Sequence, residues 1–216
     1  DSDMEIGFIK RKASFLARLG SGSACRSIEG GLVVWGQHKE LAGSTDLLGV
    51  KYPFEVHSVF LDYLDTILLV DKGQKQVSSS LGHDLMHKHP FGSQRFDQAH
   101  RHISKLIPIF KTGDLSNFIK IVELEALTLH AMMMSSDPYF ILMKPNTINI
   151  INEIWKFRNS TDVPLCFTLD AGSNVHLLYP KSSLKQVNKL IENCLSKYCQ
   201  DGQFINDQIG KGAQCL

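Results

Sequence analysis

The segment Gly20-Ser-Gly-Ser-Ala-Cys-Arg-Ser27 gathers residue types that bind anions. Its two glycines let the backbone turn tightly and bring successive amides close to a ligand, while its serines add hydroxyl donors. Arg26 adds a planar guanidinium that matches a carboxylate or a phosphate. The same pattern is typical of an ordinary glycine–serine loop that caps a helix, and the residue types alone leave both interpretations open.

A second candidate for chemistry is Asp170, at the junction between an expected strand and a turn. The small residues Ala171 and Gly172 follow it and leave room for a substrate, so its carboxylate could accept a proton as a general base. A turn aspartate that hydrogen-bonds its own backbone is a common alternative. Taken alone, the sequence Asp-Ala-Gly favours this structural role.

The histidines of the sequence do not predict a metal site. His83 and His87 would share one face of a helix, but Pro90 interrupts the segment and no acidic residue recurs at ligand spacing. We therefore expect His83, His87 and His89 to be solvated in a polar loop. His130 lies in an apolar helix, where a hydrogen-bonded core histidine is expected rather than a catalytic one.

The composition is that of a globular protein and argues against polyanionic or membrane partners. The chain has 216 residues, of which 43% are hydrophobic and 21% charged, and its formal net charge is +1. Nucleic-acid binding is not expected, because binding to phosphates usually brings a basic excess. No apolar run approaches the roughly 20 residues that span a bilayer. The five cysteines form no CxxC pair, which favours a reducing, cytoplasmic setting.

Apolar periodicity predicts an α+β chain with long helices and few strands. Helices are expected over residues 8–19, 93–110, 115–134, from Pro145 onward and over 181–198, and strands over 32–35, 64–70, 165–169 and 175–179. Pro108 is expected to bend or end the second helix and Asp114 to cap the third. A second apolar stripe of the third helix, through Leu124, Leu127 and Met134, and Ile148 of the fourth helix are expected to be buried.

Four segments, in order along the chain, form a more specific pattern than any one of them. They are Arg18-Leu-Gly-Ser-Gly-Ser-Ala-Cys-Arg-Ser27 with Gly30-Gly31 and Trp35, Lys75-Gln-Val-Ser-Ser79, Leu129-His-Ala131 with Ser136-Asp-Pro138, and Phe167-Thr-Leu-Asp-Ala-Gly-Ser-Asn174. This series closely resembles the diphosphomevalonate decarboxylase family, which belongs to the GHMP kinase superfamily. Two positions depart from the family pattern: Ser173 replaces its usual proline, and His83 stands where a methionine is common.

The resemblance implies an ATP-dependent enzyme, with Mg²⁺ accompanying ATP, that converts mevalonate 5-diphosphate to isopentenyl diphosphate in isoprenoid biosynthesis. Asp170 would take the proton of the 3-hydroxyl as catalytic base, and Arg26 would hold the substrate carboxylate. Substrate-binding roles would also fall on Ser21, Ser23, Lys75, Ser78 and Ser79. The polarity of the loop that contains the last three residues fits a solvated turn equally well.

The resemblance also implies a GHMP-kinase-like two-layer α+β fold. Residues 1–60 would be the remnant of the N-terminal GHMP domain, and residues 61–216 the C-terminal domain of helices packed on an antiparallel sheet. The active site would lie in the cleft between them, and family members are commonly homodimers. We can assign no ligand for magnesium.

One family segment has no counterpart in the sequence. The Pro-x-x-x-Gly-Leu-x-Ser-Ser phosphate loop over ATP is missing, so we expect an N-terminally truncated member that does not turn over ATP alone. The alternatives are a phosphomevalonate decarboxylase, another GHMP small-molecule kinase, and a catalytically silent fragment without the nucleotide-binding half.

Overall fold

The computed structural model describes residues 2–73 and 85–214. The chain divides into two compact units, residues 1–56 with 209–216, and residues 57–208. The segment from Ile209 onward belongs to the first unit because its backbone pairs there. Gly31 N donates to Gly210 O at 3.0 Å, and Ala213 N donates to Ile28 O at 3.1 Å.

The first unit consists of one long helix and short elements. Helix α1 spans Ser2–Gly20, longer than the expected 8–19, and a 3₁₀ helix spans Gly22–Ile28. Strands β1 (Val33–Val34) and β2 (Val50–Lys51) pair antiparallel. The sequence predicted the first of these two strands.

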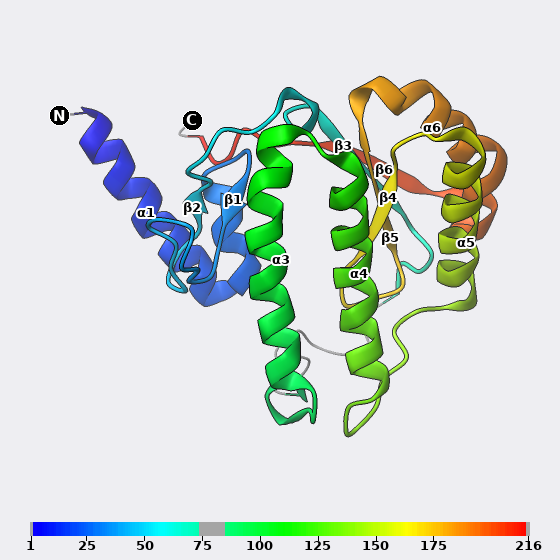
Figure 1. Cartoon of the computed structure of the whole chain (residues 1–216), viewed down its shortest axis with the longest axis horizontal. Coiled ribbons are helices and arrows are strands. Elements are labelled where there is room, and N and C mark those ends of the chain that lie inside the picture. The colour runs from blue at the N-terminus through cyan, green and yellow to red at the C-terminus, as the bar shows by residue number, and fades with distance from the viewer. Residues whose placement is uncertain (1, 74–84, 215–216) are drawn as a thin grey trace. The chain divides into compact units, whose positions relative to one another are not determined.

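The second unit contains a four-stranded antiparallel sheet with strand order β4-β5-β3-β6. The strands are β3 (Tyr63–Leu68), β4 (Cys166–Leu169), β5 (Val175–Pro180) and β6 (Phe204–Gln208). Three of them were predicted, and the α+β class is confirmed. Figure 1 shows the sheet between α4 (Leu115–Met134) on one side and α5 (Pro145–Thr161) with α6 (Leu184–Leu190) on the other.

The helices of this unit are α3 (Gly92–Thr112), α4 (Leu115–Met134), α5 (Pro145–Thr161) and α6 (Leu184–Leu190). Pro145 occupies the first turn of α5, where its missing N–H costs nothing. The expected helix over 181–198 is instead a series of 3₁₀, α and π turns, Lys181–Ser183, Leu184–Leu190, Ile191–Leu195 and Ser196–Tyr198. Among the described residues, no helix is both long and apolar enough to cross a membrane.

The core of the second unit lies between the sheet and helices α5 and α6. Alternate strand residues point into it, among them Leu68, Phe167 and Leu177, which are fully buried. Burying a side chain of this size stabilises the fold by about 1.5–3 kcal/mol. This packing fixes the register of β4 and β5, and with it the turn that joins them.

Helices α3 and α4 form a hairpin whose ends the sequence predicted in part. Asp114 caps α4 as expected, since its Oδ1 accepts from Asn117 N at 3.0 Å. Pro108 does not end α3, because a proline removes a single N–H from the helix and the following residues remain helical. The helix ends at Gly113, whose φ of 78° is left-handed and whose N–H donates to Ile109 O.

Three apolar residues expected in the core are exposed instead. Leu124 and Met134 of α4 and Ile148 of α5 are 48%, 49% and 49% exposed. Glu123 of α4 is buried in contrast, because Arg158 and Trp155 of α5 hold its carboxylate. Of the second stripe of α4, Leu127 packs against the core as expected, and only Leu124 and Met134 were wrong. Apolar spacing does not show which face of a helix will be covered by a cation from a distant part of the chain.

Candidate active site

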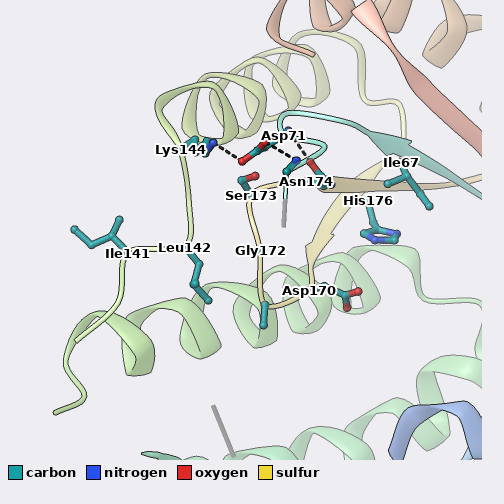
Figure 2. A pocket seen from close by; sticks show the side chains of 12 residues that line it. Ile67, Asp71, Ile141, Leu142, Lys144, Asp170, Gly172, Ser173, Asn174 and His176 are labelled. Carbon is teal, nitrogen blue, oxygen red and sulfur yellow. Dashed lines mark hydrogen bonds and ion pairs between the residues drawn. The ribbon is translucent and has the colours of Figure 1, made fainter. Parts of the chain in front are cut away.

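A pocket of about 290 Å³ lies beside the β4–β5 turn in the second unit. The turn itself supplies Asp170, Ala171, Gly172, Ser173 and Asn174, and β5 supplies His176. Figure 2 shows Lys144 and Asp71 at the Asn174 end of this turn and Asp170 at its other end. Acidic, basic and amide groups thus converge on one cavity.

Asp170 immediately follows β4 and lines the pocket with its side chain exposed. Its backbone carbonyl accepts hydrogen bonds from Gly172 N at 2.7 Å and from His130 Nε2 at 3.1 Å. These bonds use the carbonyl oxygen, and within residues 2–73 and 85–214 no group donates a hydrogen bond to the carboxylate. This geometry disfavours the alternative in which the Asp170 side chain serves only to bond its own turn.

The expectation for His130 is confirmed. Its side chain is 1% exposed, and burial lowers the pKa of its imidazole, an effect that the bond to Asp170 O partly opposes. A carbonyl can only accept a hydrogen bond, so Nε2 must carry the proton. His130 is therefore a neutral, hydrogen-bonded core histidine. Its side chain contacts the backbone carbonyl of the candidate base, Asp170.

Residues from two other elements hold the far end of the turn. Thr147 Oγ1, on α5, donates to Ser173 O at 2.6 Å, and Asn174 Oδ1 accepts from Asp71 N at 2.9 Å. Asp71 also forms an ion pair with Lys144. Hydrogen bonds from Lys144 and from Gly73 N lower the pKa of the Asp71 carboxyl, so it is ionised at neutral pH.

His176 presents the second imidazole close to Asp170. Its Nδ1 lies 2.8 Å from Asp65 Oδ2 on the neighbouring strand β3. This hydrogen bond raises the pKa of His176 against the opposing effect of burial, and the charges of Asp65, Asp170 and Asp207 raise it further. The pocket therefore contains a histidine that is readily protonated beside a candidate base.

The serine–arginine segment lies in the first unit. Ser21, Ser23 and Arg26 are all exposed, with Ser21 just before the 3₁₀ helix and the other two within it. Arg26 Nε is 3.4 Å from Ser23 O, a weak contact that leaves most of the guanidinium available. The segment is anchored through Cys25, which is fully buried and whose carbonyl accepts from Ser14 Oγ at 2.9 Å.

Packing explains why one position of this segment is glycine, independently of anion binding. A Cβ at Gly22 would lie 2.6 Å from the Trp35 ring, so glycine is needed for the close approach of that side chain. The assignments of Ser21, Ser23, Arg26 and Asp170 to a substrate remain predictions. Lys75, Ser78, Ser79 and His83 lie outside the described residues.

Of the remaining histidines, His89 differs from expectation. It is 7% exposed rather than solvated, because both of its ring nitrogens have partners. Its Nδ1 accepts from Phe91 N at 3.1 Å, and its Nε2 lies 3.0 Å from Ser135 Oγ. His87 is exposed as expected.

Comparison with known proteins identifies the family. Residues 66–214 match the family model of the mevalonate 5-diphosphate decarboxylase C-terminal domain, which is more than half of the chain. The chain belongs to the diphosphomevalonate decarboxylase family. Residues 3–46 match the diphosphomevalonate decarboxylase-like N-terminal domain. The resemblance inferred from four motifs is thereby confirmed.

Individual members of this decarboxylase family show how much of the chain, and how much of each relative, the similarity covers. A diphosphomevalonate decarboxylase of Ganoderma lucidum is 28% identical over 207 residues, which is 91% of this chain and 49% of the relative. A phosphomevalonate decarboxylase of Haloferax volcanii is 26% identical over 100 residues, 46% of this chain and 31% of the relative. The solved structure of MDDEF in complex with MVAPP, AMPPCP and magnesium has a TM-score of 0.80 at 27% identity, covering 94% of this chain and 59% of that one. The chain spans about half the length of the Ganoderma relative.

The related MDDEF complex contains magnesium, so we searched this chain for side chains that could bind a metal ion. Within residues 2–73 and 85–214, no three His, Cys, Asp or Glu side chains are grouped so that they could hold a metal ion. We therefore assign no magnesium ligand in this part of the chain.

Sequence reasoning missed four residues of the pocket and its support: Asp65, Asp71, Lys144 and His176. Asp71 follows β3 and Lys144 precedes α5, whereas Asp65 lies within β3 and His176 within β5. Position at an element end was therefore an available signal for Asp71 and Lys144 only. The pairings Asp65–His176 and Asp71–Lys144 depend on tertiary contacts between distant segments.

Proposed function

We propose that the chain supplies the base-bearing part of an enzyme that decarboxylates mevalonate 5-diphosphate with ATP, giving isopentenyl diphosphate. The observation that carries this proposal is the placement of Asp170 in a polar pocket, where the described residues bind its carbonyl and none of them donates a hydrogen bond to its carboxylate. Family membership and the ligands of the related MDDEF complex support the choice of substrate and nucleotide.

In this proposal Asp170 accepts the proton of the tertiary 3-hydroxyl as the hydroxyl oxygen attacks the γ-phosphorus of ATP. A tertiary alcohol is a poor nucleophile, and a positioned base contributes about 10²–10⁴-fold to such a step. ADP leaves with the electron pair of the broken phosphoanhydride bond. The small side chains of Ala171 and Gly172 leave room for the substrate next to the carboxylate.

The second step is fragmentation. The bond between C3 and the phosphorylated oxygen breaks, and inorganic phosphate takes its electron pair. The bond to the carboxyl carbon also breaks, and its electrons become the new double bond as carbon dioxide leaves. Arg26 would orient the carboxylate through a bidentate contact. Ser21, Ser23, Lys75, Ser78 and Ser79 would hold the diphosphate.

Binding and product analysis test the proposal. Calorimetry on the 216-residue chain measures affinity for mevalonate 5-diphosphate. Because the chain spans about half of the Ganoderma relative, turnover is measured on a fusion to the part of that relative which the match does not cover. We expect ATP-dependent release of one carbon dioxide per phosphate. ADP formation without carbon dioxide would indicate a kinase, and binding without any turnover a silent fragment.

A second candidate is a phosphomevalonate decarboxylase, supported by the Haloferax relative. Ser173 in place of the family's proline leaves this alternative open. The chemistry at Asp170 would be the same, and only the phosphate subsite would differ. Competition between the mono- and diphosphate in the same calorimetric assay decides between the two. Tighter binding of the monophosphate would favour this alternative.

The proposal also places the enzyme in the cytoplasm as a homodimer. The described cysteines Cys25, Cys166, Cys194 and Cys199 are free, which suits a reducing compartment. Light scattering of the purified protein measures its oligomeric state directly.

A further inference from the structure

The turn that presents Asp170 has little intrinsic rigidity. Its sequence is Ala171-Gly-Ser-Asn174, in which no proline restricts the backbone. Gly172 adds flexibility, because glycine has the greatest backbone freedom of all residue types. A carboxylate on such a turn samples many positions unless other elements hold the backbone. A base must lie within hydrogen-bond reach of the proton that it abstracts.

The first anchor is His130 on α4. Its neutral Nε2–H donates to the Asp170 carbonyl, which also accepts from Gly172 N. Since the imidazole is 1% exposed, water does not compete for this bond. The bond ties the backbone of the base itself to a long helix.

The second anchor is Thr147 on α5, three residues along the chain from Lys144. Thr147 is fully buried, and its single hydroxyl makes two hydrogen bonds. It accepts from Lys144 N at 3.1 Å and donates to Ser173 O at 2.6 Å. Because the Thr147 oxygen accepts the hydrogen bond from Lys144 N at the start of α5, its hydroxyl proton is free to point toward Ser173 O in the turn. A carbonyl at each end of the turn is thus held by a different helix.

We propose that His130 and Thr147 are positioning residues that hold the Asp170–Asn174 turn, and with it the Asp170 carboxylate, in the geometry for proton abstraction. This inference rests on the proposed function of Asp170. Neither side chain transfers a proton in the reaction. Their role is to reduce the number of turn conformations, so that the carboxylate meets the hydroxyl in one of them.

Matched variants test the inference. Thr147→Val removes the hydroxyl at nearly constant shape, whereas Thr147→Ser keeps it. His130→Leu removes the donor, whereas His130→Gln keeps an N–H near the position of Nε2. Asp114→Ala controls for stability, because it removes the cap at the N-terminal end of α4, the far end of that helix from His130.

Two measurements report on each variant: hydrogen exchange of the Gly172 amide in the 216-residue chain, and kcat and KM of the fusion. For Thr147→Val and His130→Leu we expect roughly tenfold or greater acceleration of Gly172 exchange and a loss of kcat of about 10–100-fold, with KM changed less than about threefold. Thr147→Ser and His130→Gln should recover most of the rate.

The inference is overturned if Thr147→Val matches Thr147→Ser in both measurements, or if Asp114→Ala loses as much kcat at equal thermal destabilisation. Failure of the proposed function gives a different result. In that case Asp170→Asn keeps its rate, while Gly172 exchange still responds to the loss of the Thr147 hydroxyl.

Discussion

The Asp65 carboxylate and the His176 imidazole form a 2.8 Å ion pair that joins β3 to β5 at the wall of the pocket containing Asp170. Asp170 after β4 and Asp207 on β6 add their negative charges around the same ring. Carboxylates from three neighbouring elements therefore favour the protonated form of His176.

This pair should make stability depend on pH in a definite direction. The folded-state pKa of His176 is raised above its ordinary value of 6.5, so its stabilisation is present below that value and is lost as pH rises through the folded pKa. His176→Gln should therefore lower the free energy of unfolding by roughly 0.5–1 kcal/mol at acid pH and by less at alkaline pH. Urea unfolding between about pH 5 and 9 measures the difference. The exposed His87→Gln serves as control, and an equal loss at every pH would contradict the assignment.

His130 should titrate in the opposite direction. Burial lowers its folded-state pKa, so the stability associated with its neutral form is present above the ordinary value and is lost as pH falls. An NMR titration of the imidazole signals, assigned with His130→Gln and His176→Gln, should place the His130 midpoint below and the His176 midpoint above the ordinary value of 6.5. Coincident midpoints would show that the two environments do not differ.

The ion pair between buried Glu123 and half-buried Arg158 should contribute strongly to the stability of the α4–α5 contact. Arg158 makes two bonds to the Glu123 carboxylate, at 2.6 and 3.1 Å, and donates to Leu165 O. Glu123→Gln leaves the guanidinium without its counter-charge and should cost about 2–4 kcal/mol in urea unfolding. The exposed Glu192→Gln should stay within about 0.5 kcal/mol of the parent.

A double mutant separates the pair from its surroundings. Glu123→Gln with Arg158→Met removes both charges, so it should recover part of the stability lost by Glu123→Gln alone. If the losses from the two single variants simply add, the pair contributes no coupling and this interpretation of the contact fails.

The sequence predicted the elements whose pattern is local. The cap at Asp114, the first turn at Pro145 and the strands on either side of Asp170 all follow from residue types within a few positions. Strand β6 was missed, because Phe204–Gln208 is an edge strand whose residues are mostly exposed and show no apolar alternation. Its pairing with β3 depends on the rest of the sheet.

Less of the candidate site than of the fold could be predicted, because much of the site depends on contacts between distant segments. Asp170 was predicted because a small-residue motif surrounds it, and the structure places it at a pocket. Arg26 was predicted because it follows a glycine–serine run, and its role stays a prediction. The residues that hold Asp170 in place come from sequence positions far from it. His130 and Thr147 have ordinary helical surroundings, and only the fold brings them to the turn.

Arg26 should affect binding as well as rate. If its guanidinium holds the substrate carboxylate, Arg26→Ala should weaken mevalonate 5-diphosphate binding in calorimetry and lower kcat of the fusion, each by about tenfold or more. Arg26→Lys keeps the charge but not the fork, so it should recover binding better than rate. Arg11→Ala, at an exposed position of α1, is the control for loss of a positive charge. Unchanged binding by Arg26→Ala would exclude the carboxylate role.

The most direct test is the single-turnover rate of the fusion carrying Asp170→Asn, compared with Asp162→Asn at an exposed left-handed position that asparagine tolerates. A general base acts in the transition state, so carbon dioxide release should fall by about 10²–10⁴-fold or more while the dissociation constant for mevalonate 5-diphosphate stays within about threefold. Asp162→Asn should keep the parental rate. A near-parental rate for Asp170→Asn would show that another group accepts the proton.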